Sequence, residues 1–228
     1  MNAIENVKVR KKSWDKRGFI FGMVIAALWF GRYAAVAQTT DAKASNQGGQ
    51  ARLGTAAQGS EDSPAHKYFT DVVLVTQNGE KKRFYTDLLQ GKVVIINSFF
   101  ATCKGTCLPM NRNLEKVQEA LGDHIGKDVH IISISVDPTV DTPASLKEYA
   151  KTLHAKPGWY FITGDPENVG FALKKLGQFV PDKQDHNNII LIGNDRTGLW
   201  KKAFGLAQSS ELIKVVESVL DDKPSSDK

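Results

Sequence analysis

The pattern of apolar and polar positions predicts an α/β domain over residues 67–221. Two apolar runs, 93–99 and 130–136, predict buried strands, because a parallel strand covered on both faces has no polar side. Shorter apolar runs predict five more strands, at Val72–Val75, Lys82–Tyr85, Trp159–Thr163, Asn188–Ile192 and Leu199–Ala203. Segments with an apolar residue every three or four positions predict helices at 111–121, 143–153, 166–176 and 209–220.

Turn and cap residues set the order of these elements. Asn78-Gly79 is typical of a β-hairpin turn, and Thr86–Leu89 predicts a short turn or helical piece. Thr142-Pro143 and Asp165-Pro166 each place a capping residue before a proline at the first helical position. The order is a hairpin, two βα units, a third βα unit, a second hairpin and a last helix. With right-handed crossovers, this order predicts a thioredoxin-like α/β sandwich that begins with a β-hairpin.

The N-terminal residues have the pattern of an export signal. A basic tail, 1–17, precedes the apolar segment 18–37, whose uninterrupted run of about 13 residues is shorter than the ~20 that span a bilayer. Ala35-Val36-Ala37 fits a cleavage site, whereas a snorkelling Arg32 would extend the segment to spanning length. We favour a retained signal anchor over a cleaved signal peptide, and both over a buried core helix.

Either favoured reading places the domain outside the cytoplasm, in the periplasm or an equivalent compartment. Residues 38–66 are small and polar without an apolar period and predict a flexible linker, and 222–228 predict a polar tail. The net charge of +5 is concentrated at the N-terminus, where six basic and two acidic residues among the first eighteen give +4. Nucleic acid is therefore not an expected partner, and the basic tail is expected in the cytoplasm, beside the membrane.

Both cysteines, Cys103 and Cys107, lie between the predicted strand 93–99 and the helix that follows. The carboxyl end of a strand in an open α/β sheet is where ligands collect. At a helix start, residues i and i+4 share one face, and the helix N-terminus lowers the pKa of a thiol such as Cys103. The pair can form a disulfide or bind one metal ion. An inert structural disulfide is disfavoured, because closing so short a loop adds little stability.

Two thiolates leave a metal site incomplete, so a third ligand is expected. Soft thiolate pairs select Cu(I) and Zn. The chain has five histidines, and only His186 directly precedes a predicted central strand, where a thioredoxin-like fold brings the loop against the cysteines. Met110 is interpreted as a core residue rather than a soft ligand. Asp137 and Asp141 are interpreted as capping a turn and a helix, and Phe99 and Phe100 as packing residues.

These motifs together resemble the Sco/SenC family of copper-binding, thioredoxin-like proteins. The resemblance covers about 67–220 and rests on Cys103-x3-Cys107, Ile134-Ser135-Val136-Asp137-Pro138, Asp141-Thr142-Pro143, Trp159-x-x-Ile162-Thr163-Gly164 and Asp185-His186. It implies that Cys103, Cys107 and His186 bind one copper ion, Cu(I) or Cu(II). It also implies a single membrane helix and a role in maturing the binuclear copper centre of cytochrome c oxidase, by delivering copper or by reducing cysteines.

The chain departs from the family pattern at the cysteines. The family commonly has Cys-Pro-x-x-Cys-Pro, whereas here Lys104 replaces the first proline and Pro109 comes one residue late. The target cuproprotein, whether an oxidase subunit or another, does not follow from the sequence. The alternative is a membrane-anchored thiol:disulfide oxidoreductase in which Cys103 and Cys107 are catalytic. Either function needs a thiol reductant as partner. A peroxidase is disfavoured, since its threonine and arginine partners are not evident.

Overall fold

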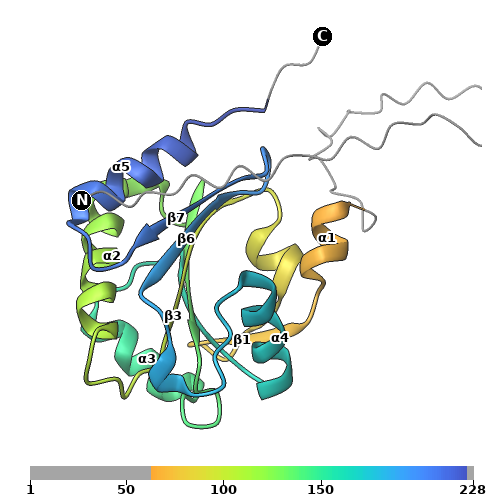
Figure 1. Ribbon diagram of the computed structural model, residues 1–228, viewed down its shortest axis with the longest axis vertical. Helices are drawn as coiled ribbons and strands as arrows, with labels where there is room; N and C mark the ends of the chain where they lie inside the picture. The colour runs from red at the N-terminus through yellow and green to blue at the C-terminus, as the bar shows by residue number, and fades with distance from the viewer. Residues whose placement is uncertain (1–62, 225–228) are drawn as a thin grey trace, which may run out of the picture. The chain divides into compact units, whose positions relative to one another are not determined.

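The computed structural model describes residues 63–224, which fold around one seven-stranded sheet (Figure 1). The predicted apolar segment 18–37 and most of the linker lie outside these residues. The strand order is β2-β1-β5-β4-β3-β6-β7. The strands are β1 (Val73–Thr76), β2 (Lys81–Arg83), β3 (Val93–Phe99), β4 (Val129–Ser135), β5 (Trp159–Thr163), β6 (Ile189–Asn194) and β7 (Leu199–Phe204). The α/β class is confirmed, with a mixed sheet.

Strand pairing gathers several loops at one edge of the sheet. Strands β3, β4 and β5 are parallel, with Ile95 opposite Ile131. Strand β6 runs antiparallel to β3, so that Ile95 also faces Ile192. The carboxyl ends of the three parallel strands and the beginning of β6 therefore lie at the same edge. The residues that follow β3 and those that precede β6 meet there.

Helices cover both faces of the sheet (Figure 1). Helices α2 (Cys107–Leu121), α3 (Pro143–Thr152) and α5 (Ser209–Leu220) lie on one face. On the other lie α1 (Pro64–Phe69), α4 (Pro166–Leu176) and a π-helix, η1 (Phe84–Leu89). Successive strand residues point to opposite faces, so Ile95 packs in the core beneath α2 and α5, and Ile96 packs in the core beneath η1 and α4. Both faces of β3 are thus buried, as its unbroken apolar run predicts.

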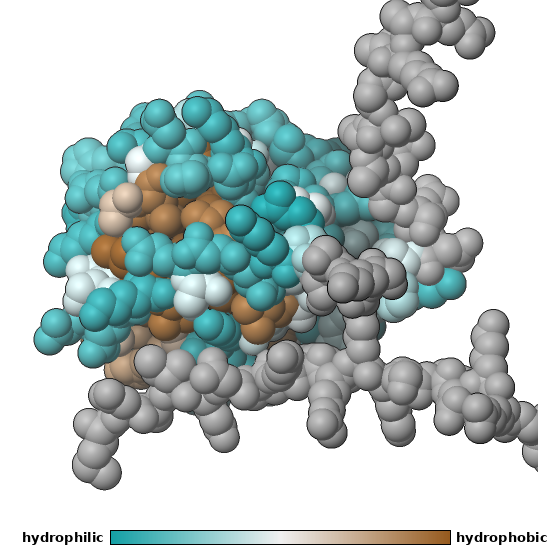
Figure 2. Space-filling view, turned by 90° about the horizontal axis from the view of Figure 1, so that it is seen from above, coloured by the Kyte–Doolittle hydropathy of each residue, from teal (hydrophilic) through white to brown (hydrophobic). Residues whose placement is uncertain are grey.

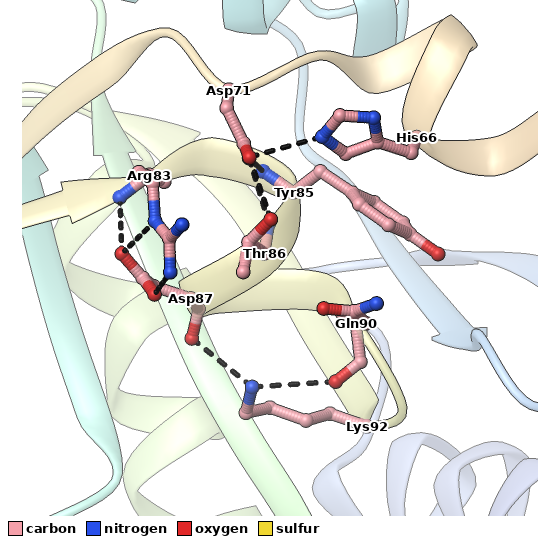
Figure 3. A network of polar contacts seen from close by, with 8 residues as sticks. All are labelled: His66, Asp71, Arg83, Tyr85, Thr86, Asp87, Gln90 and Lys92. Atoms are coloured by element: carbon pink, nitrogen blue, oxygen red, sulfur yellow. Dashed lines mark hydrogen bonds and ion pairs between the residues drawn. The ribbon is translucent and has the colours of Figure 1, made fainter. Parts of the chain in front are cut away.

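The segment after β2 differs from the prediction of a strand through Tyr85. The strand ends at Arg83, and Phe84 begins η1. The Asp71 carboxylate accepts the N–H groups of Tyr85 and Thr86, at 3.1 and 2.8 Å, and these are amides left free at a helix start. His66 of α1 lies 3.0 Å from the same carboxylate (Figure 3). Helix α1 was not predicted, and this polar network holds it against η1.

The surface seen in Figure 2 is mainly hydrophilic, with hydrophobic residues gathered toward its middle. Within residues 63–224, no helix combines the length and the hydrophobicity that crossing a membrane requires. Two short 3-10 turns complete the fold, η2 (Gly122–His124) and η3 (Lys183–Asp185). Turn η3 directly precedes His186 and belongs to the edge of the sheet where the parallel strands end.

Candidate metal centre

The two cysteines lie at different depths at the end of β3. Cys103 is half-buried in the loop after the strand, where its N–H donates to the carbonyl of Phe100 at 3.1 Å. Cys107 is fully buried and is the first residue of α2. The prediction that both thiols share the face of a helix was therefore wrong, because the helix begins four residues later than that argument requires. The folding of the loop, rather than helical spacing, brings the thiols together.

The start of α2 is fixed by Pro109 and by an unusual cap. Proline is accepted in the first turn, since its missing N–H has no partner there in any helix. Thr106, the residue before the helix, does not cap α2 with its side chain. Its hydroxyl instead donates to the Asn188 side-chain carbonyl at 2.6 Å. This bond joins the cysteine segment to the residues between His186 and β6.

His186 faces the thiols with one nitrogen. Its Nδ1 lies 2.9 Å from the Lys183 carbonyl, which can only accept, so Nδ1 carries the proton. Nε2 therefore presents its lone pair, and it lies 3.0 Å from the Sγ atom of Cys107. The Phe100 ring stands edge-on to the imidazole, with 5.3 Å between ring centroids. The Lys183 carbonyl thus selects the Nδ1–H tautomer, which leaves Nε2 free to bind a metal ion.

Cys103, Cys107 and His186 form one cluster whose ligand atoms all lie within 4.8 Å of one another. Both cysteines are free thiols. Burial, followed by the neighbouring Cys103, raises the pKa of Cys107 to about 12. Its S–H therefore donates to His186 Nε2, and this proton is the one that a metal ion would replace. Two sulfurs and an imidazole nitrogen fit a soft ion such as Cu(I).

The other histidines lie elsewhere and make other contacts. His66, His124 and His154 lie beside carboxylates, and His130 is buried with its ring stacked on Tyr160 at 5.9 Å. Among the described residues, this cluster is the one group of three potential metal ligands. The structure thus brings His186, the histidine that precedes β6, together with both cysteines.

The two aspartates have other roles than the sequence suggested. Asp141 does not cap α3, since the hydroxyl of Thr142 does. The buried Asp141 carboxylate instead accepts the Ala101 N–H at 3.1 Å and the Ser135 hydroxyl at 2.6 Å. Burial raises its pKa. Asp137 pairs with the ammonium of Lys183 at 2.6 Å. Both aspartates therefore support the loops that carry the cluster.

Met110, Phe99 and Phe100 are buried, as predicted. Met110 packs so closely on Gly205 that a Cβ there would lie 2.7 Å from its sulfur. The sequence did not predict the Lys183–Asp137 ion pair or the Thr106–Asn188 hydrogen bond. No local pattern reveals them, because each joins residues that are tens of positions apart in the chain.

Comparisons with known proteins place this geometry in a family. An SCO1 protein homologue of Bacillus subtilis is 33% identical over 118 residues, which are 50% of this chain and 60% of that protein, less than two thirds of its length. A SCO2-like protein of Rickettsia felis is 33% identical over 152 residues, 63% of this chain and 72% of that protein.

Solved structures share the fold. The structure of BsSco, described as a member of the Sco family of cytochrome c oxidase assembly proteins with a disulfide switch, has a TM-score of 0.55 and 27% identity, over 67% of this chain and 95% of that one. Yeast Sco1 with copper bound has a TM-score of 0.56 and 24% identity, over 69% and 96%, a likeness of fold. Residues 60–220 match the SCO1/SenC family model, and the chain therefore belongs to the SCO1/SenC family.

Proposed function

We propose that this protein binds one copper ion as cargo through Cys103, Cys107 and His186, and passes it to a copper protein. The observation that carries the proposal is the cluster itself, with three soft or borderline donors within 4.8 Å. Copper bound to yeast Sco1, a protein of the same fold, supports the choice of ion. Thiolate ligands favour Cu(I), and the imidazole also accepts Cu(II).

The three ligands differ in how they take part. Cys107 is buried and at the start of α2, so it is the fixed ligand. Cys103 is half-buried, so it is the ligand that a partner can reach. His186 keeps its lone pair toward Cys107 because the Lys183 carbonyl holds the proton at Nδ1. Binding displaces the proton between Cys107 and His186, and release to an accepting protein begins at Cys103.

The proposed recipient is the copper subunit of cytochrome c oxidase or another cuproprotein. The description of BsSco as belonging to a family of oxidase assembly proteins supports this recipient. We further propose that the basic tail 1–17 and the apolar segment 18–37 attach the protein to a membrane, with the domain outside the cytoplasm. A thiol reductant is then needed there to keep the cysteines reduced.

The test is copper binding by the reduced full-length protein in detergent, with and without His186→Ala. We expect one tightly bound Cu(I) per chain and at least about a 100-fold weaker affinity in the variant. Loss of a residue that only supports a ligand already costs up to about 100-fold, and here the ligand itself is lost. Competition with a chromophoric Cu(I) chelator measures both. Equal affinities in the two proteins would refute the three-ligand site.

A second candidate is a thiol:disulfide oxidoreductase, favoured by the two free thiols of unequal exposure. The Cys103 thiolate would attack a target disulfide and form a mixed disulfide, releasing one target thiolate. Cys107, after passing its proton to His186 Nε2 at 3.0 Å, would then attack the sulfur of Cys103 and release the second target thiolate. The target gains two electrons and the pair becomes a disulfide. Cys103→Ser would abolish this reaction, whereas His186→Ala would change the first attack, by Cys103, little.

A further inference from the structure

Lys183 contacts the candidate site in two ways. Its carbonyl accepts the proton of His186 Nδ1 at 2.9 Å and thereby orients Nε2 toward Cys107. Its ammonium lies 2.6 Å from the Asp137 carboxylate and 5.4 Å from the centroid of the Phe100 ring. One residue therefore links the imidazole of the site to the loop after β4.

The histidine loop has only two apolar contacts with the core, through Ile189 and through the Phe100 ring that stands edge-on to His186. None of the residues 181–189 is buried, and η3 is a single turn of three residues. A loop of this kind has few core contacts that define its position, so its polar contacts carry much of that task. The Lys183–Asp137 pair is such a contact, and it acts three residues before His186.

Asp137 is itself firmly held. It is buried, its N–H donates to the Ser135 hydroxyl at 3.0 Å, and its carboxylate accepts the Thr139 hydroxyl at 3.2 Å. The Ser135 hydroxyl donates in turn to Asp141, whose carboxylate also accepts the Ala101 N–H. Ala101 lies two residues before Cys103. A continuous polar path therefore runs from the histidine loop to the cysteine loop.

We propose that Lys183 is a positioning residue for metal binding, which holds the His186 imidazole in the binding orientation through its ion pair with Asp137. The inference rests on the proposed function. An ion pair that is partly exposed adds little to folding stability. Its contribution is to the geometry of the histidine loop, where it acts together with the Thr106–Asn188 hydrogen bond that also joins this loop to the cysteine segment.

The test compares Lys183→Met with Lys174→Met. Lys174 is a matched control, because its ammonium also lies over a phenylalanine ring, at 4.6 Å from the centroid of Phe179, in a different part of the chain. We expect Lys183→Met to weaken Cu(I) affinity about tenfold, the effect typical of a residue that supports a metal-bound histidine. Lys174→Met should match the wild type, and Lys183→Arg should restore most of the affinity.

A double-mutant cycle separates positioning from a general structural role. If Lys183 acts through His186, then Lys183→Met should have no further effect on affinity in the His186→Ala background. An undiminished tenfold loss in that background, or wild-type affinity in Lys183→Met, would overturn the inference. If the methionine variant does not fold, Lys183→Gln replaces it in the same comparison, with thermal unfolding as the check.

A copper-free measurement distinguishes failure of this inference from failure of the proposed function. The ¹⁵N chemical shifts of the His186 ring report which nitrogen carries the proton. We expect the Nδ1–H form in the wild type and a mixture in Lys183→Met. If the wild type bound no copper but the shifts changed as expected, the proposed function would fail and the positioning role would stand. Unchanged shifts would refute that role.

Discussion

In the cysteine segment, residues 99–110, four side chains are buried in the core, whereas the histidine loop, residues 181–189, has none. Phe99 and Phe100 precede Cys103, and Cys107 and Met110 lie on the first turn of α2. The histidine loop is held by hydrogen bonds and by the pair between Lys183 and Asp137. Apolar burial fixes one half of the site and polar contacts fix the other.

This difference separates folding stability from ligand geometry, two properties that one substitution usually changes together. Burial of the cysteine segment contributes to the free energy of unfolding, because large apolar side chains leave water there. The histidine loop removes little apolar surface from water, so changes in it should affect ligand geometry while folding stability stays nearly constant. The two halves of the site should therefore respond to different measurements.

The largest effect is expected from Phe99→Ala. Phe99 is fully buried, stacked on Tyr149 at 5.2 Å and edge-on to Phe161 at 5.6 Å. Truncating a buried phenylalanine typically costs about 3–5 kcal/mol of folding stability. Chemical denaturation measures this loss. Phe179→Ala is the control, because Phe179 is 43% exposed and should change stability by less than about 1 kcal/mol.

Acid should destabilise the core at His130, a buried residue far from any role in the site. Burial, followed by the charge of Lys92, lowers the pKa of His130 from 6.5 to about 4. Between these values the unfolded chain binds a proton that the folded chain does not. Stability should thus be complete above pH 6.5 and fall as pH drops toward 4, by about 3 kcal/mol from this group.

The variant His130→Phe isolates this contribution. Phenylalanine keeps a ring that can stack on Tyr160 and removes the Nδ1 atom, which has no hydrogen-bond partner. We expect the stability of the variant to depend less on pH between 6.5 and 4 than that of the wild type. Parallel pH curves for the two proteins would show that His130 does not titrate as described.

His186→Ala tests the polar half of the comparison. We expect the Cu(I) affinity to fall about 100-fold or more while the free energy of unfolding changes by less than about 1 kcal/mol. The half-buried His186 ring loses an edge-on contact with Phe100 but no fully buried apolar surface. His124→Ala is the matched control, because His124 is exposed and paired with Asp128 on the surface. A large loss of stability in His186→Ala would contradict the view that the loop is held mainly by polar contacts.

The two halves of the site were not equally predictable from the sequence. The apolar run of β3 and the period of α2 are local patterns, so the position of the cysteines at a strand end followed directly. His186 could be chosen because it precedes a central strand, and topology brings that loop to the same edge. The route by which Cys103 meets Cys107 was missed, because an irregular loop has no period.

Side-chain contacts between distant segments were beyond sequence reasoning. Asp71 lies 14 residues before Tyr85, and its carboxylate accepts the Tyr85 N–H where the expected strand gives way to η1. Asp137 was interpreted as a local cap, yet it pairs with Lys183, 46 residues away. The same short polar residues serve caps and long-range contacts, and only the folded structure decides between these roles.

Thr106→Val should give the smallest effect, and it tests where the two halves meet. The Thr106 hydroxyl donates to Asn188 at 2.6 Å, and valine keeps the shape without the donor. A hydrogen bond contributes about 1 kcal/mol, so we expect an approximately fivefold weaker Cu(I) affinity, with stability nearly unchanged. Thr102→Val, at an exposed position of the same loop, is the control. Wild-type affinity in Thr106→Val would mean that the Lys183–Asp137 pair alone positions the histidine loop, whereas a loss that adds to that of Lys183→Met would mean that the loop is held independently at both ends.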